Sequence, residues 1–238
     1  MVTGGSRGMG KAMVEAFAAR GGSVVIASRK LEACQRLAAE LRQRHGVSVL
    51  PVACNVSSWS DCDALVDAAY GEFGKVDVLI NNAGMSPLYP SLAEVTEALF
   101  DKVIGVNLRG PFRLGSLIGT RMAAGDGGSI INIGSIAAIR PGPHELPYAT
   151  AKAGLNALTE GLARAFGPKV RVNCIQAGPF ETDIAKAWSP ETVARFEQTL
   201  ALGRCGRPEE IVGAALYFAS PAASFCTGAI LRLDGGAP

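Results

Sequence analysis

The sequence predicts an α/β protein with a Rossmann-type, doubly wound parallel sheet in a single domain. Short, nearly continuous apolar runs alternate with longer stretches of helical periodicity, as expected of strands that are covered on both faces. A glycine-rich segment stands before the first helix. The 238 residues, of which 48% are hydrophobic and 18% charged, suffice for one core and are too apolar for a disordered chain.

Six apolar runs are predicted to be strands. They cover residues 23–28, 47–53, 76–81, 129–134, 170–175 and 229–233. Another strand should precede the glycine-rich segment, but only Met1 and Val2 stand there. In a doubly wound sheet this first strand is central. We therefore expect it to be largely missing from this chain, with a gap of about 4.8 Å in the sheet. We also expect the natural protein to begin several residues earlier.

Helical periodicity fills the intervals between these runs. The first predicted helix carries an apolar stripe of Met9, Ala12, Met13, Ala16 and Phe17. The others cover residues 31–45, 61–73, 96–122, 148–166 and 209–220. Repeated strand–helix units predict right-handed crossovers, with helices on both faces of the sheet.

The composition argues against several classes of protein. The net charge is +2 and no run of basic residues occurs, so nucleic acid is not an expected partner. No stretch of 18 apolar residues exists, so no membrane segment is expected. The six cysteines lack CxxC spacing, and we expect inert thiols and no metal site. This cysteine usage fits a reducing cytoplasm.

The segment from Thr3 to Gly10 reads TGGSRGMG and leads into the first helix. Glycines let a backbone approach a pyrophosphate closely, and a helix N-terminus offers free N–H groups to an anion. The sequence therefore indicates a dinucleotide site here. The alternative is a glycine-rich turn with no ligand.

The end of the second strand indicates which dinucleotide would bind. Ser28 and Arg29 stand where an acidic residue would bind the ribose 2′-hydroxyl of NAD, and no Asp or Glu is present. A serine and a guanidinium can instead bind a 2′-phosphate, and Arg7 could add a second cation. The sequence favours NADP over NAD. The alternative is that Arg29 and Lys30 only begin a solvated helix.

Four polar residues between positions 107 and 152 are candidates for catalysis. Tyr148 and Lys152 are four positions apart on a predicted helix, so they share a face. A nearby cation favours ionisation of the phenol, which makes the pair a candidate proton donor. Ser135 follows a strand, and Asn107 lies in an apolar helical run, where its amide must find partners. The alternatives are a solvated Tyr–Lys pair and a satisfied core amide.

Together these motifs resemble the classical short-chain dehydrogenase/reductase family over nearly the whole chain. The glycine loop, Asn82-Ala83-Gly84, Asn107, Ser135, Tyr148 and Lys152 follow the family's order and spacing. Within the family the chain is most similar to the 3-oxoacyl-thioester (acyl carrier protein) reductases. Shared local patterns include INIGS before the catalytic helix and GRPEE at residues 206–210.

The resemblance implies a role for each matching residue. The catalytic residues would be Ser135, Tyr148, Lys152 and Asn107, with Tyr148 as general acid or base. The cofactor-binding residues would be Gly4, Ser6, Arg7, Gly8, Met9, Gly10, Ser28, Arg29, Asn55, Val56, Asn82, Tyr148, Lys152, Phe180 and Thr182. The family usually has Pro-Gly before Phe180, and here it is Ala177-Gly178. This departure makes the order of the following loop less certain, because the proline would fix φ.

The resulting hypothesis is an NADP(H)-dependent oxidoreductase that interconverts a ketone and a secondary alcohol. We expect one domain over residues 1–238, with a cofactor half at about 1–134 and a catalytic and substrate half at about 135–238. The family implies a homodimer or homotetramer. A 3-oxoacyl thioester is one candidate substrate, and sugar, polyol or steroid dehydrogenases and a non-catalytic NADP sensor are the alternatives. The expected substrate loop is apolar, with Ile184, Ala187, Trp188, Phe196 and Leu200.

Overall fold

The computed structural model describes residues 1–183, 185 and 188–238. In this part of the chain seven strands form one parallel sheet in the order β3-β2-β1-β4-β5-β6-β7. The strands are β1 (Val2–Thr3), β2 (Val24–Ser28), β3 (Val49–Ala53), β4 (Val78–Asn81), β5 (Gly128–Ser135), β6 (Val170–Ala177) and β7 (Ile230–Leu233). The strand order reverses between β1 and β4, so the predicted Rossmann-type fold is confirmed.

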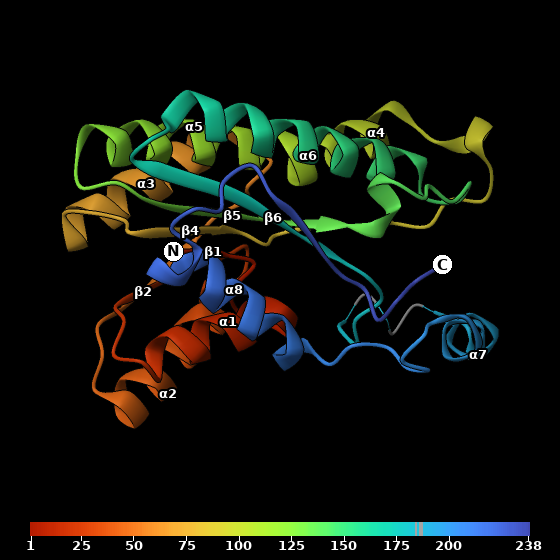
Figure 1. Ribbon diagram of the computed structural model, residues 1–238, viewed down its shortest axis with the longest axis horizontal. Coiled ribbons are helices and arrows are strands. Elements are labelled where there is room, and N and C mark those ends of the chain that lie inside the picture. Colours follow the sequence, from red (N-terminus) through yellow and green to blue (C-terminus); the bar gives the residue numbers. More distant parts are fainter. Residues whose placement is uncertain (184, 186–187) are drawn as a thin grey trace.

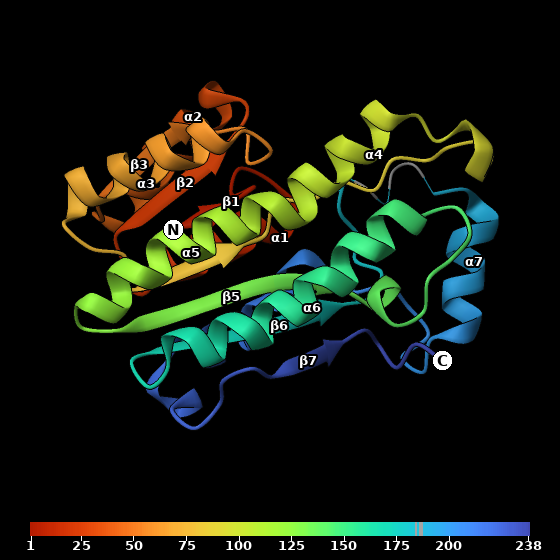
Figure 2. The same cartoon turned by 90° about the horizontal axis from the view of Figure 1, so that it is seen from above.

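Helices cover both faces of the sheet (Figure 1). One face carries α1 (Gly8–Ala18), α2 (Leu31–His45) and α8 (Val212–Ala219), and the other carries α3 (Trp59–Phe73), α4 (Glu97–Ile104), α5 (Gly110–Ala124) and α6 (Leu146–Phe166). Figure 2 shows α7 (Pro190–Thr199) beyond the carboxyl ends of the strands. The expected substrate residues Ile184 and Ala187 lie outside the described residues. Within the described chain no helix combines the length and apolarity needed to span a bilayer.

The first strand is short, as predicted, but the predicted gap in the sheet is wrong. Val2 pairs with Ile26 of β2 and with Ile80 of β4. The amino group of Met1 donates to the Val78 carbonyl at 2.8 Å, and the Ile80 N–H donates to the Met1 carbonyl at 2.9 Å. Two strand residues therefore bridge β2 and β4, because the backbone of Met1 continues the ladder.

The helix predicted over residues 96–122 is present as an unbroken helical run from Glu97 to Ala124. It contains a π-helical turn between α4 and α5, Gly105–Arg109, in which the Gly110 N–H donates to the Gly105 carbonyl. A π turn inserts an extra residue into a helix and is frequent at functional sites. Apolar periodicity alone does not reveal it, since the residues on both sides keep a helical pattern.

Each face of the sheet has its own core. Met13, Leu41 and Phe218 belong to the core on one face, and Leu65, Ile118 and Ile130 belong to the core on the other. Buried polar side chains connect the central strands to α6: Asn81 donates to Asn132 at 2.9 Å, and Asn132 donates to Thr159 at 2.9 Å. These bonds fix α6 over β4 and β5, and α6 carries the two candidate residues Tyr148 and Lys152.

Candidate active site

The glycine loop joins β1 to α1 at the carboxyl end of the sheet. Gly4 and Gly8 have φ values of +62° and +51°, which favour glycine. A Cβ on Gly10 would lie 2.2 Å from the Gly4 carbonyl oxygen, so this turn of the loop admits no side chain there. Helix α1 has no acidic residue in its first turn and no side-chain cap. Its N–H groups are therefore open to an anion, and the loop fits a pyrophosphate.

The residues predicted to distinguish NADP from NAD lie together at the end of β2. The Ser6 hydroxyl donates to the Ser28 hydroxyl at 3.0 Å, which joins the glycine loop to this strand. Arg29 is exposed and has no ion pair among the described residues. Its guanidinium is therefore available to an anion beside Ser28.

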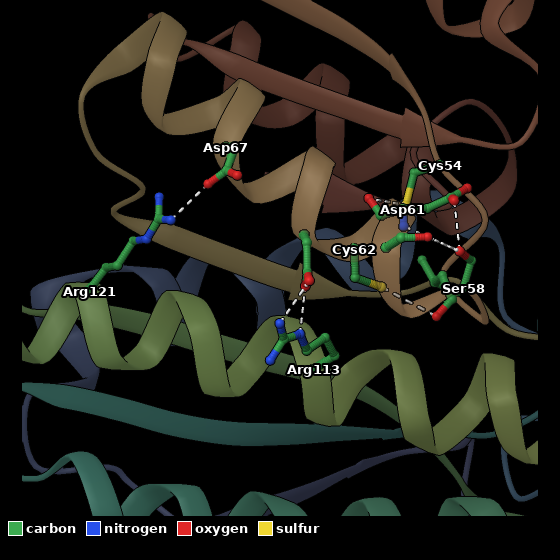
Figure 3. A network of polar contacts seen from close by, with 10 residues as sticks. Cys54, Ser58, Asp61, Cys62, Asp67, Arg113 and Arg121 are labelled. Carbon is green, nitrogen blue, oxygen red and sulfur yellow. Dashed lines mark hydrogen bonds and ion pairs between the residues drawn. The ribbon is translucent and has the colours of Figure 1, made fainter.

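The loop that carries Asn55 and Val56 is held in place by hydrogen bonds to α3. The Asn55 N–H donates to Asp61 at 3.0 Å, and the Asn55 side-chain oxygen accepts from Ser57. Ser58 caps α3, because its hydroxyl accepts from the Asp61 N–H. A separate ion pair joins α3 to α5, where Arg113, labelled in Figure 3, binds Asp63 through two hydrogen bonds at 2.6 and 2.8 Å.

Asn82 binds the glycine loop from the end of β4. Its side-chain amide donates to the carbonyls of Thr3 and Gly4 at 2.9 and 3.2 Å. The Thr3 hydroxyl in turn accepts from the backbone N–H of Asn82. The structure therefore gives Asn82 a clear scaffolding role, since both of its amide contacts shape the loop that precedes α1.

Asn107 lies in the π turn with its side chain fully buried. The amide group donates to the carbonyls of Met85 and Val103 at 2.8 and 2.9 Å, and its oxygen accepts from the Met85 N–H at 3.3 Å. These contacts match the alternative reading of a satisfied core amide. Both N–H donors of the side chain are in use, so a water at this position has to bind the oxygen or the backbone.

Ser135, Tyr148 and Lys152 come together at the carboxyl end of β5. Ser135 is the last residue of that strand, and Tyr148 and Lys152 occupy successive turns at the start of α6. A side-chain hydrogen bond joins Ser135 and Tyr148. The Lys152 ammonium lies 5.6 Å from the centre of the Tyr148 ring and donates to the Ile133 carbonyl at 2.6 Å. The spacing predicted from sequence therefore produces a contiguous set of groups.

Burial governs the electrostatics of this set. It raises the pKa of Tyr148 to about 12; the hydrogen bond from Ser135 opposes the rise and the charge of Glu145 adds to it. Burial also lowers the pKa of Lys152 to about 8. The sequence predicted a phenol made more acidic by the neighbouring cation. The direction in the structure is opposite, because the loss of solvent makes the largest contribution to the pKa of Tyr148.

The loop after β6 covers the glycine loop. Ala177 pairs with Ser135 and with Leu233, so β6 continues through the position where the family has proline. Phe180 is buried, and an ideal Cβ on Gly8 would lie 3.4 Å from the Thr182 side chain. Arg7 forms an ion pair with Asp183 at 3.1 Å. A cavity of about 370 Å³ is lined by residues of this loop, Glu181 and Thr182 among them, and by Val193 and Glu197 of α7.

Sequence reasoning missed two residues beside Tyr148. Tyr89 is buried; its hydroxyl donates to the Pro143 carbonyl at 2.9 Å and accepts from the Leu146 N–H at 2.8 Å. Glu145 stands directly before α6 and lines a groove with Tyr148. For Tyr89 the signal in the sequence was a tyrosine within a proline-rich segment. For Glu145 the sequence gave no signal.

Among the described residues no group of three His, Cys, Asp or Glu is placed to hold a metal ion.

Comparison with known proteins agrees with this geometry. A family profile described as Enoyl-(Acyl carrier protein) reductase matches residues 4–238. The 3-oxoacyl-[acyl-carrier-protein] reductase FabG of Chlamydia muridarum is 36% identical over 237 residues, which cover 99% of this chain and 95% of the relative.

Two solved structures show the same fold at similar identity. The NADPH-dependent 3-quinuclidinone reductase of Rhodotorula rubra has a TM-score of 0.92 and 32% identity, with 98% of this chain and 88% of that chain covered. A 7α-hydroxysteroid dehydrogenase complexed with NADH and 7-oxo glycochenodeoxycholic acid has a TM-score of 0.94 and 34% identity, with 99% and 92% covered.

The fold and the relatives define an oxidoreductase that interconverts a carbonyl group and an alcohol. The chain belongs to the short-chain dehydrogenase/reductase family, and its likeness to the 3-oxoacyl-acyl-carrier-protein reductases is confirmed.

Proposed function

We propose that this protein is an NADPH-dependent ketone reductase with Tyr148 as its general acid. The observation that carries the proposal is the contiguous set of Ser135, Tyr148 and Lys152 beside the glycine loop. The cofactor supplies a hydride to the carbonyl carbon when it is bound. The products are a secondary alcohol and NADP⁺.

Each residue of the set has a distinct task in this proposal. The Tyr148 hydroxyl donates its proton to the carbonyl oxygen as negative charge develops there. Ser135 donates a hydrogen bond to the same oxygen and orients the substrate. The buried Lys152 ammonium has further donors for the ribose hydroxyls and stabilises the phenolate that remains. Asn107 would hold a water for reprotonation through its oxygen or its backbone, since its amide donors are occupied.

The proposed cofactor is held by the cofactor half of the chain, about residues 1–134. The open glycine loop would hold the pyrophosphate through Gly4, Ser6, Arg7, Gly8, Met9 and Gly10. Asn55 and Val56 would line the adenine pocket, Asn82 would flank the ribose, and Phe180 and Thr182 from the second half would meet the nicotinamide. The neighbours in the fold include an NADPH-dependent reductase and a dehydrogenase solved with NADH, so the preference for NADP rests on Ser28 and Arg29.

Arg29→Asp is expected to raise the Michaelis constant for NADPH about 10- to 100-fold, because a charge-assisted hydrogen bond is worth about 1.5–3 kcal/mol. The constant for NADH should change little or fall, since a carboxylate can accept from the 2′-hydroxyl. Steady-state kinetics with both cofactors measure this, and Arg36→Asp on the exposed face of α2 serves as the matched charge reversal. Equal effects of Arg29→Asp on both cofactors would refute the assignment.

The substrate proposed first is a 3-oxoacyl thioester, in line with the likeness to the FabG reductase. A steroid or another bulky ketone is the second candidate, since a hydroxysteroid dehydrogenase shares the fold. The discriminating experiment follows NADPH oxidation across acetoacetyl thioesters, cyclic ketones and keto-sugars. A chain that binds NADPH yet reduces none of these would favour the non-catalytic sensor.

All six cysteines are free, which supports a cytoplasmic location.

We also propose a homodimer or homotetramer built on α5 and α6. The outer face of α6 is exposed at the small residues Ala153, Ala157 and Gly161. Phe112 of α5 is 46% exposed and contacts Trp59, itself 44% exposed. Light scattering at micromolar concentration is expected to give two or four times the chain mass of 24.6 kDa. A mass of one chain would contradict the proposal.

A further inference from the structure

Two buried cysteines, Cys54 and Cys62, meet under the loop between β3 and α3. The Cys54 thiol donates to the Asp61 carbonyl at 3.7 Å, and Asp61 directly precedes Cys62. The Cys62 thiol donates in the opposite direction, to the Val56 carbonyl at 3.4 Å. Figure 3 shows both side chains beside the first turn of α3. A side-chain hydrogen bond also joins the two thiol groups, so the sulfur atoms lie close together.

The two thiols differ in acidity. The pKa of Cys62 is lowered, chiefly by the hydrogen bond that it accepts from Cys54; Arg113 adds to this effect, and burial and the carboxylates of Asp63 and Asp61 oppose it. Cys62 also lies in the first turn of α3, where the helix N–H groups favour a thiolate. The hydrogen bond and burial raise the pKa of Cys54. Cys62 is therefore the nucleophile of the pair, and Cys54 is the thiol that keeps its proton.

A short segment of the chain covers the pair. Cys54 is 3% exposed and Cys62 is 0% exposed, whereas Ala53 and Asn55 on either side of Cys54 are exposed. The Asn55 N–H is held by one hydrogen bond of 3.0 Å to a side chain of α3. Local opening of residues 53–58 would bring the thiols to solvent without unfolding the sheet, since loops open at a lower free-energy cost than core strands. The site thus suits a small, uncharged reagent.

We propose that Cys54 and Cys62 form a redox-active dithiol site that takes a small peroxide as its oxidant. The Cys62 sulfur attacks one oxygen of hydrogen peroxide, the O–O bond breaks, and a sulfenic acid and one water form. The Cys54 sulfur then attacks the Cys62 sulfur, and the S–O bond breaks. The hydroxyl group leaves as a second water with the proton of the Cys54 thiol. Two electrons pass from the thiols to the peroxide, and the product is one intramolecular disulfide.

Formation of the disulfide acts on the adenine side of the cofactor site, a consequence that rests on the proposed function. An S–S bond of about 2.05 Å draws the end of β3 toward α3, and neither sulfur can then donate a hydrogen bond. The Val56 carbonyl loses its donor and has no room to move toward α5, because a Cβ on Gly110 would lie 2.4 Å from it. The Cys54 N–H donates to the Ser28 carbonyl at 2.9 Å, so the shift also reaches the end of β2. The oxidised chain is therefore expected to bind NADPH more weakly.

Peptide mass measurement tests for the bond. Tryptic cleavage after Arg44 and Lys75 leaves Cys54 and Cys62 in one peptide that contains no other cysteine. After the whole chain is treated with hydrogen peroxide, this peptide should be lighter by two hydrogen atoms and should not react with a maleimide under denaturing conditions. After treatment with dithiothreitol it should take up two maleimides. A peptide that keeps two reactive thiols, or that gains oxygen in place of losing hydrogen, would overturn the proposal.

Single variants test the division of roles between the two thiols. Cys54→Ala and Cys62→Ala each keep a small apolar side chain. In Cys54→Ala the peptide should gain oxygen at Cys62, because no second thiol can displace the hydroxyl group. In Cys62→Ala the remaining thiol should stay unmodified. Cys226→Ala removes a half-buried cysteine elsewhere and is the matched control, which should form the disulfide as the wild type does. Equal oxidation of the thiol that remains in Cys54→Ala and in Cys62→Ala would contradict the assignment of the nucleophile.

Cofactor binding measures the consequence of oxidation. Fluorescence titration of NADPH should give a Kd about 3- to 10-fold higher for the oxidised than for the reduced wild type, the range for the loss of about one hydrogen bond. Dithiothreitol should restore the lower Kd, and NADP⁺ bound beforehand should slow disulfide formation. A disulfide that leaves Kd unchanged would overturn the coupling to the cofactor. A chain that forms the disulfide and binds no nicotinamide cofactor in either state would count against the proposed function and not against the thiol pair.

Discussion

Replacing Tyr148 with Phe is expected to lower kcat for ketone reduction about 10²- to 10⁴-fold, the usual contribution of a positioned general acid. The change removes one hydroxyl and keeps the ring that lines the groove beside α4. Ser135 cannot take over as the acid, because an aliphatic hydroxyl loses its proton far less readily than a phenol. The variant should therefore bind both substrates and fail at the proton transfer.

The measurement is NADPH oxidation with 4-methylcyclohexanone and with an acetoacetyl thioester. The control is NADPH binding, followed by cofactor fluorescence, which should be close to that of the wild type. Ser135→Ala tests the neighbouring hydroxyl and should cost less, since it orients the oxygen without supplying the proton. A Tyr148→Phe variant that turns over at the wild-type rate would contradict the proposed mechanism.

Lys152→Met is expected to abolish turnover and to stabilise the cofactor-free chain. Lys152 is 4% exposed, and burial lowers the pKa of its ammonium group to about 8 from the ordinary value of 10.5. Each unit of such a shift is worth about 1.4 kcal/mol at neutral pH, and the lost hydrogen bond to Ile133 takes back about 1 kcal/mol. We expect a net gain of about 1–3 kcal/mol in the free energy of unfolding, at the cost of the cation that Tyr148 needs.

The pH dependence of stability tests whether burial of the Lys152 charge causes the gain in the free energy of unfolding. Below about pH 8 both the folded and the unfolded chain hold the lysine proton, so the full penalty is present. Between about 8 and 10.5 the unfolded chain binds more protons, and the contribution of Lys152 to stability becomes more favourable as pH rises. The difference in the free energy of unfolding between Lys152→Met and the wild type should therefore become smaller as pH rises across this interval.

Urea unfolding of both chains at neutral pH and near pH 10.5 measures the effect. Lys102→Met, on the exposed surface of α4, is the matched control and should change the unfolding free energy by no more than about 0.5 kcal/mol. A Lys152→Met chain that is less stable than the wild type, or whose advantage does not depend on pH, would show that burial of the charge is not the cause.

Local patterns in the sequence were sufficient for most of the sheet and for the grouping of the candidate residues Ser135, Tyr148 and Lys152. The strands are apolar runs, and Tyr148 and Lys152 are close in sequence, so one helix determines their geometry. The exact end of β6 was less accessible: the run was predicted to stop at residue 175, but pairing with β7 carries the strand to Ala177. Pairing partners that are distant in sequence set such boundaries.

The electrostatic environment of the site could not be read from sequence. The direction of the Tyr148 pKa depends on burial by α4 and by the loop after β4, which come from other parts of the chain. The ion pair between Arg7 and Asp183 joins residues 176 positions apart. Glu145 belongs to the site only because of these surroundings, since its own sequence neighbours give no hint of a groove.

The π turn at Gly105–Arg109 sets the rotational phase between α4 and α5. Helix α4 presents Leu99 and Val103 to the groove, whereas α5 presents Arg113 to Asp63 of α3 and Leu114 to the core. A chain shorter by one residue in this turn would rotate α5 by about 100° relative to α4. The relative orientation of the two helices therefore depends on the length of this segment, and an insertion or deletion here would shift Leu99 and Val103 relative to the scaffold of the loop that carries Asn55 and Val56.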